Sequence, residues 1–186
     1  MIDRRHILAL AGGAAIVGVA GVLAWPRPAL GFGPVTLRQP RAAALERLGP
    51  GALASELCGG VDGTLYSVRD PGFETENNES IPVMAMFGAE DGSVSEISAS
   101  LSWPNGGISA EDWHKLVTRQ EAELLRRIVS ANRTASRADD DLALETETTF
   151  THADAIIQLH SRWMRRSGAA FSRLHWIAAG QKSVIV

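Results

Sequence analysis

Residues 94–128 read VSEISASLSWPNGGISAEDWHKLVTRQEAELLRRI and contain the two clearest structural patterns in the chain. From Val94 to Trp103, mostly apolar residues alternate with mostly polar ones, and this period of two predicts a half-buried antiparallel strand. Ser109, with Asp112 three residues later, is typical of a capped helix start. The residues that follow at helical spacing are Trp113, Leu116, Val117, Gln120, Leu124 and Ile128. The stretch therefore predicts a strand followed directly by an amphipathic helix.

Shorter patterns on both sides extend this strand and helix into a domain. Upstream, we expect a helix over residues 40–57, broken at 49–51, and then strands at 64–68 and 83–87. Downstream, we expect a strand at 142–150, a second capped helix over 151–168 and two short strands within 171–186. The predicted fold class is α+β: a mainly antiparallel sheet packed with two or three helices, preceded by one N-terminal transmembrane or signal helix. No internal repeat is visible in the sequence.

The composition excludes several classes of protein. The chain has 186 residues, of which 45% are hydrophobic and 21% are charged, which is ordinary for a globular protein and unlike a disordered one. Its single cysteine, Cys58, excludes a small fold held by disulfides within the chain. The balance of 18 basic against 21 acidic residues disfavours nucleic acid as a partner.

The N-terminal part contains a candidate membrane segment. Ile7–Trp25, ILALAGGAAIVGVAGVLAW, carries no charge over 19 residues, and a helix of that length just crosses a hydrocarbon core of about 30 Å. Arg4 and Arg5 precede the segment, whereas only Arg27 follows it closely. The excess of positive charge before the segment places the N-terminus in the cytoplasm and the remainder of the chain across the membrane.

The sequence Asp3-Arg4-Arg5-His6-Ile7-Leu8, followed by a Gly- and Ala-rich run, resembles the twin-arginine export signal of bacteria. It departs from that pattern at Asp3, where Ser or Thr is usual, and at Ile7, where Phe is commoner. The resemblance implies export read from Arg4 and Arg5, and it implies nothing about the fold that follows. An ordinary signal anchor is the alternative, and whether the segment is cleaved stays open because neither candidate cleavage site is a clean A-x-A.

These observations divide the chain into three parts. Residues 1–25 form the signal anchor or export segment, residues 26–40 form a spacer rich in Pro and Gly, and residues 41–186 form one α+β domain. We expect a single-pass protein of the cell inner membrane with its C-terminal domain in the periplasm, or a periplasmic protein if the segment is removed.

Four arginines form the candidate binding site. They lie close together in the sequence near the end of the expected second helix: Arg162, Arg165, Arg166 and Arg173. The functional interpretation is contact with an anionic group, in lipid headgroups or in an acidic partner. The structural interpretation is that these charges complement the negative end of that helix.

No other residue pattern predicts a site of catalysis, metal binding or cofactor binding. Cys58 ends an apolar stripe without a nearby His and is interpreted as an inert thiol. His152 and His160 are eight residues apart, which is not the spacing of a helical zinc pair, and His114 is distant in sequence. The acidic runs at 139–141 and 74–79 lack the ligand pattern of a calcium loop. The phosphate-loop, G-x-S-x-G and C-x-x-C motifs are absent from the sequence.

Three functions are compatible with these features. The first is an envelope protein whose small domain acts as an interaction module or as an accessory subunit of a membrane complex. The second is a periplasmic, hydrolase-like enzyme that uses carboxylates and a histidine such as His114 or His152, and the missing motifs disfavour it. The third is a domain that binds a small ligand between its sheet and its helices.

Overall fold

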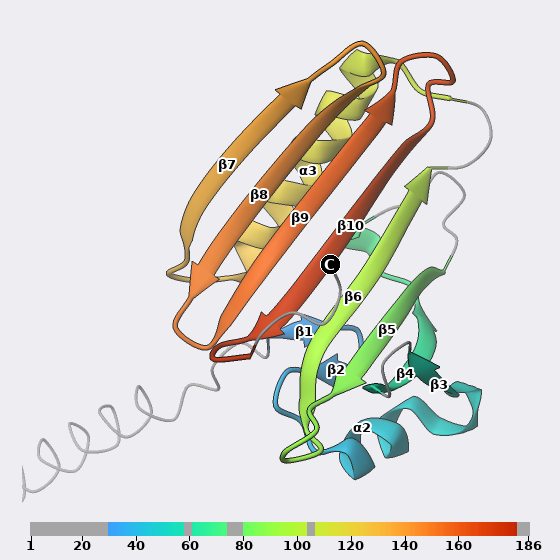
Figure 1. Ribbon diagram of the computed structural model, residues 1–186, viewed down its shortest axis with the longest axis vertical. Coiled ribbons are helices and arrows are strands. Elements are labelled where there is room, and N and C mark those ends of the chain that lie inside the picture. Colours follow the sequence, from blue (N-terminus) through green and yellow to red (C-terminus); the bar gives the residue numbers. More distant parts are fainter. Residues whose placement is uncertain (1–29, 58–60, 74–79, 104–106, 182–186) are drawn as a thin grey trace, which may run out of the picture.

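One antiparallel sheet of eight strands makes up most of the computed structural model, which describes residues 30–57, 61–73, 80–103 and 107–181 (Figure 1). The strand order across the sheet is β3-β4-β5-β6-β10-β9-β8-β7. In chain order, the strands are β3 (Leu53–Leu57), β4 (Val61–Val68), β5 (Ile81–Phe87), β6 (Val94–Trp103), β7 (Asn132–Asp139), β8 (Ala143–His152), β9 (Ala155–Met164) and β10 (Ala170–Ala178).

Short elements and one long helix accompany the sheet. They are the β1–β2 hairpin (Gly31–Phe32 and Val35–Thr36), α2 (Arg41–Leu48), the 3-10 turns η1 (Gly49–Gly51) and η2 (Pro71–Phe73), and α3 (Ala110–Arg127). Figure 1 shows α3 lying against one side of the half of the sheet that contains β7 to β10.

The sheet has the same topology on both sides of the β6–β10 pair. Helix α2 precedes the meander β3-β4-β5-β6, and helix α3 precedes the meander β7-β8-β9-β10. The last strand of each meander meets the other in antiparallel pairing, with Ser98 opposite His175 and Ser100 opposite Arg173. The described part of the fold is therefore built from two units of one helix and four strands, although the sequence shows no repeat.

The strand and the helix predicted from residues 94–128 are confirmed. In β6, Ile97, Ala99 and Leu101 are buried against the helical side of the sheet, as the alternation predicts. The strand is not half-buried, however, because Glu96 and Ser98 on its other side are buried as well. The Ser109 hydroxyl accepts a hydrogen bond from the Asp112 backbone N–H at 3.1 Å, which caps the start of α3.

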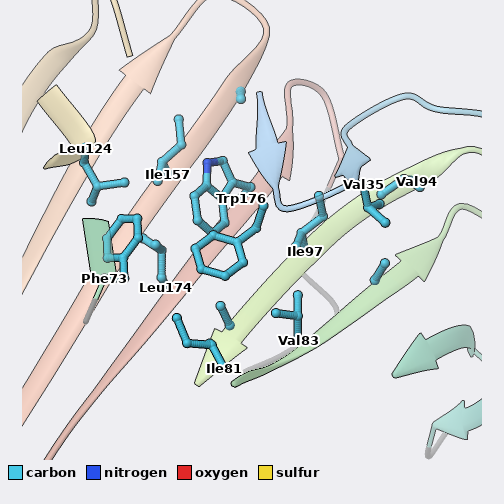
Figure 2. Close-up of a cluster of buried hydrophobic side chains, with 14 of the residues drawn as sticks. Val35, Phe73, Ile81, Val83, Val94, Ile97, Leu124, Ile157, Leu174 and Trp176 are labelled. Atoms are coloured by element: carbon cyan, nitrogen blue, oxygen red, sulfur yellow. The ribbon is translucent and has the colours of Figure 1, made fainter. Parts of the chain in front are cut away.

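The main core lies between the sheet and the elements on its helical side (Figure 2). The Phe32 ring lies 5.2 Å from the Trp176 ring and 5.5 Å from the Phe73 ring, so the β1–β2 hairpin and η2 meet over β10. Leu124 from α3 and Ile157 from β9 belong to the same cluster. Burial of these large side chains supplies most of the stabilisation of the fold.

A row of hydroxyl groups separates this core from a smaller one under the start of α3. Thr146, Ser161 and Ser172 stand next to one another on β8, β9 and β10, and the Ser161 and Ser172 oxygens are 2.8 Å apart. The buried members of the smaller cluster are Trp113, Val117, Leu144 and Ala170. Helix α3 therefore packs on the sheet through two apolar contacts with a polar row between them.

The predicted α+β class is wrong. The described residues are mostly antiparallel β-sheet and contain two α-helices, α2 and α3. Strands account for the regions that had been expected to form the second helix and part of the first. The apolar residues in those regions fit both the 3.6-residue period of a helix and the two-residue period of a strand. Pairing with neighbouring strands determines that they form strands.

The largest single difference is at residues 151–168, where the structure has the end of β8, a tight turn and β9 in place of a helix. His152 and Ala155 flank the tight turn between β8 and β9, and β9 pairs with β8 on one side and with β10 on the other. Thr151 and Asp154 therefore belong to a strand end and a turn and cap no helix. The buried residues Ile157 and Leu159 follow a period of two.

Three further elements differ from the sequence-based expectation. The first helix ends at Leu48, because Gly49 adopts a φ of 65°, and the following residues form η1 and β3. Strand β7 was not predicted, since all eight of its residues are exposed and carry no apolar alternation. The tail contains β10 in place of two short strands, and residues 182–186 lie outside the described residues.

Among the residues that the structure describes, no helix is long and apolar enough to cross a membrane. The predicted segment Ile7–Trp25 and the signal residues Arg4 and Arg5 lie outside the described residues, as does Cys58. Within the expected spacer, Phe32 and Val35 are fully buried in the main core, so the folded part includes residues 31–36.

Candidate functional site

The face of the sheet opposite the helices is the candidate site. Helices α2 and α3, the β1–β2 hairpin and η2 all contribute buried residues to clusters on the other face. We call the opposite side the open face, because none of the described helices or strands packs over it, although Met86, Glu96 and Ile177 on this side are buried. Its exposed apolar side chains include Leu65 on β4, Ile156 on β9 and Phe171 on β10, each with at least 36% of its surface exposed.

A groove of about 320 Å³ lies on the open face where the two meanders meet. One wall is apolar and contains Leu65, Pro82 and Met84, which come from β4 and β5. Ser98 and Ser100 on β6 and Arg173 on β10 form the opposite side. The groove exists because the pairing of β6 with β10 places Arg173 beside Ser100.

A second hollow of about 460 Å³ continues from the groove around the edge of β4. The two share Leu65 and Pro82, and the second hollow also includes Leu48, Leu53 and Arg47. The apolar surface of this half of the sheet therefore extends from Arg173 at the centre to Arg47 at the edge.

The four predicted arginines lie on the β9–β10 hairpin, so they do not complement the end of a helix. Arg162 lies 2.8 Å from Glu145, measured between Nε and Oε1. Arg165 pairs with Asp139 and donates from Nε to the Asp140 carbonyl oxygen at 2.8 Å.

The other two arginines differ from this pair. Arg166 in the turn and Arg173 on β10 are exposed and have no hydrogen bond or ion pair with the described residues. Arg173 alone of the four lines the groove. The anionic contact stays a prediction.

A buried histidine and a buried carboxylate lie next to the groove. His175 Nδ1 is 3.9 Å from Glu96 Oε1, and both side chains are almost fully buried. Burial lowers the pKa of His175 to about 4, and the positive charges of Arg173 and His160 act in the same direction. The imidazole is therefore neutral near pH 7. A buried base with so low a pKa is poorly suited to general base catalysis at that pH.

The histidines singled out for an enzymatic site are not brought together. His114 on α3 lies 3.3 Å from Arg137 of β7, and Arg137 stands opposite Thr146 near the start of β8. His152 lies at the end of β8, where its Nδ1 accepts the Asp154 backbone N–H at 3.1 Å. Six strand residues, about 20 Å, separate these positions.

No three His, Cys, Asp or Glu side chains converge in a metal-binding group within the described ranges. The acidic residues of 74–79 lie outside those ranges. Of the run at 139–141, Asp139 pairs with Arg165, and Asp140 accepts the backbone N–H groups of Leu142 and Ala143 at 2.7 and 2.8 Å. These acidic side chains therefore organise the β7–β8 turn.

On the helical side of the sheet, the charges of Asp70, Glu123 and Arg127 form a cluster in which acidic and basic side chains pair with one another. Arg127 donates two hydrogen bonds to Asp70, at 2.7 and 2.8 Å, and a third to Glu123 at 2.6 Å. The Arg127 guanidinium also lies over the Phe73 ring at 4.7 Å. These contacts fix the end of α3 to η2 and leave no free charge for a ligand in the adjacent cavity of about 470 Å³.

Sequence reasoning identified Arg173 but not the residues that surround it. Ser98 and Ser100 were seen only as the polar side of a strand, and His175 was not singled out. No local pattern joins them to Arg173, because the contact depends on the pairing of two strands that are far apart in the chain.

The chain was compared with known protein families, with curated proteins and with solved structures, and none of them matches it.

Proposed function

We propose that this chain is an envelope protein whose segment at residues 7–25 anchors or exports a periplasmic binding domain, and that the open face of the sheet contacts the partner. The observation that carries the proposal is the unequal covering of the sheet. The described helices and the β1–β2 hairpin pack on one face, while the other bears a groove and exposed apolar side chains. Exposed apolar surface beside polar residues is typical of interaction sites.

The rival functions have less support in the geometry. An enzyme that uses carboxylates with His114 or His152 would need them in a cleft. Asp154 lies 3.9 Å from His152, but the groove and the two larger hollows include neither histidine. A ligand between the sheet and the helices would have to use the cavity of about 470 Å³ beside Leu124 and Trp176, where the charged side chains Asp70 and Arg127 already pair with each other. The groove on the open face has the polar and apolar groups that a binding site needs.

Site-specific photo-crosslinking in membranes tests the proposal. A photoreactive phenylalanine analogue would replace Phe171, which is exposed on the open face, and Ala122, which is exposed on α3, serves as the matched control. We expect the probe at position 171 to capture a partner and the probe at position 122 to capture none.

Equal capture from both positions would contradict the assignment of the open face. A chain that is recovered uncrosslinked and as a solitary monomer from gently solubilised membranes would contradict the binding function itself. Separation of membranes from soluble protein, with sequencing of the mature N-terminus, tests the anchor independently.

A further inference from the structure

Along two neighbouring rows of the open face, the side chains change from apolar to polar at the β6–β10 pair. One row across the sheet reads Leu65, Met84, Ser98, His175, Gln158 and Thr149, each residue standing beside the next on the neighbouring strand. The first two residues are apolar and the other four are polar. The two meanders share one topology, but they present different chemistry to the same side.

The next row shows the same division with charge added. Ser100, Arg173, His160 and Glu147 stand beside one another on β6, β10, β9 and β8, while Pro82 lies on the apolar side of the groove. A ligand that spans the boundary would therefore meet apolar side chains at one end and a guanidinium with hydroxyl groups at the other.

Arg173 carries the exposed positive charge at this boundary, while the nearest buried carboxylate, Glu96, lies 3.9 Å from His175. Arg162 and Glu145 neutralise each other at 2.8 Å, and Glu147 is two strands from Arg173, about 10 Å away. Arg173 has no carboxylate partner in the described part of the chain. The pKa of His175 is lowered by burial and also by the charges of Arg173 and His160, which agrees with a positive local field.

Two hydroxyl groups of the groove are further donors: Ser100 stands opposite Arg173, and Ser98 stands opposite His175. Ser98 and Ser100 make no hydrogen bond to any residue that the structure describes, and both line the groove. A guanidinium and hydroxyl groups together suit a carboxylate, because a carboxylate accepts several hydrogen bonds and carries the opposite charge.

We propose that the groove binds a small amphipathic monocarboxylate, with its apolar body on Leu65, Pro82 and Met84 and its carboxylate on Arg173 and Ser100. The proposal rests on the proposed function of the open face and gives that face a ligand class. A groove of about 320 Å³ is at the small end of ligand sites, so the ligand has about 10–15 non-hydrogen atoms.

The test uses the full chain in zwitterionic lipid nanodiscs, labelled with ¹³C at the methionine methyl groups. Met84 lies in the groove, so its methyl signal reports directly on occupancy, while Met164 at the end of β9 serves as an internal reference. Octanoate is the probe, octanamide has the same chain without the charge, and acetate has the charge without the chain. Empty nanodiscs measure partitioning of the probes into lipid.

We expect octanoate to shift the Met84 signal to saturation, octanamide to bind at least about tenfold more weakly, and acetate to leave the signal unchanged. Arg173→Gln should weaken octanoate binding by about 10- to 100-fold. Arg166→Gln is the matched control, because it makes the same change at an exposed arginine outside the groove and should have no effect.

Equal binding of octanoate and octanamide, or equal effects of the two arginine variants, would overturn the proposal. A blocked apolar peptide that shifts Met84 where octanoate does not would assign the groove to a protein segment and overturn it as well. If the probe at position 171 captures a partner but octanoate fails to bind, the carboxylate inference is wrong and the binding function stands. Far-UV circular dichroism of each variant separates loss of binding from loss of fold.

Discussion

The contact between Asp70 and Arg127 offers the most direct test of how α3 is held in place. Asp70→Asn removes the negative charge but keeps an oxygen that can accept the Gly72 backbone N–H, which now donates to Asp70 at 3.0 Å. The Asp70 side chain is 10% exposed and the Arg127 side chain 32% exposed. The substitution therefore leaves a guanidinium that is largely buried without its bidentate partner.

Removal of one partner of a fully buried ion pair typically costs about 3–5 kcal/mol. Here the cost is smaller, because Arg127 keeps its bond to Glu123 and nearly a third of its side chain is in contact with solvent. We expect a loss of about 2 kcal/mol in the free energy of unfolding, which for a domain of this size lowers Tm by about 4–8 °C.

The assay is chemical and thermal unfolding of the full chain in nanodiscs, followed by near-UV circular dichroism. A double-mutant cycle with Arg127→Gln isolates the coupling between the two side chains, and we expect at least about 1 kcal/mol. A loss below about 0.5 kcal/mol for Asp70→Asn, or a coupling near zero, would refute the assignment of this pair as a clamp.

The pH dependence provides an independent check on the same pair. Burial opposes ionisation of Asp70, but the hydrogen bonds and positive charge of Arg127 outweigh it and lower the pKa of the carboxyl group. The stabilisation is therefore present above the unfolded-state pKa and is lost as the pH falls through the folded-state value. The difference between the wild type and Asp70→Asn should shrink at acidic pH, whereas a purely steric effect of the substitution would persist.

Two further predictions concern His175 and the glycines. Because the folded-state pKa of His175 is about 4 and lies below the unfolded value near 6.5, we expect stability to fall by about 3 kcal/mol as the pH drops from 6.5 to 4. His175→Gln should flatten that part of the unfolding curve, and an unchanged slope would contradict a neutral buried imidazole. A Cβ atom at Gly107 would lie 2.6 Å from the Ser167 carbonyl oxygen, whereas at Gly92 it would meet nothing within 4 Å, and both residues have positive φ. Gly107→Ala should therefore lower the free energy of unfolding by at least about 1 kcal/mol more than Gly92→Ala, and equal losses in urea unfolding would disprove the close approach.

Sequence periodicity predicted the elements whose burial is regular and whose ends are marked locally. In β6, Ile97 and Ala99 lie on the core side as the alternation predicts, although Glu96 and Ser98 on the other side are also buried. In α3, Ser109 caps the start and Leu124 lies on the buried stripe. Each of these elements has a polar side and an apolar side, so the pattern alone indicates its type.

Periodicity failed where a strand has no apolar alternation, or where its apolar residues also fit the spacing of a helix. Strand β7 is exposed on both sides, so residues such as Thr134 and Ser136 give no alternation to detect. In β9, the apolar residues Ile156, Ile157 and Trp163 also fit the spacing of a helix. Pairing with β8 and β10 is a tertiary effect that overrides this local ambiguity.

The candidate site was only partly predictable for the same reason. A cluster of arginines was visible in the sequence, but only the fold shows that Arg162 and Arg165 have acidic partners and that Arg173 has none among the described residues. The apolar wall and the serines of the groove come from strands whose neighbours are set by long-range pairing.

The junction between β6 and β10 also has a consequence for how the chain folds. Six of the seven strand contacts in the large sheet join strands that follow one another in the sequence, and only the β6–β10 contact closes a long loop. Local hairpins form quickly, whereas a distant pairing must first overcome the entropy of loop closure. We therefore expect each meander to form early and the joining of the two to set the folding rate. Until that step, β6 and β10 both have unpaired edges, and the newly made chain is most prone to pair with another copy of itself.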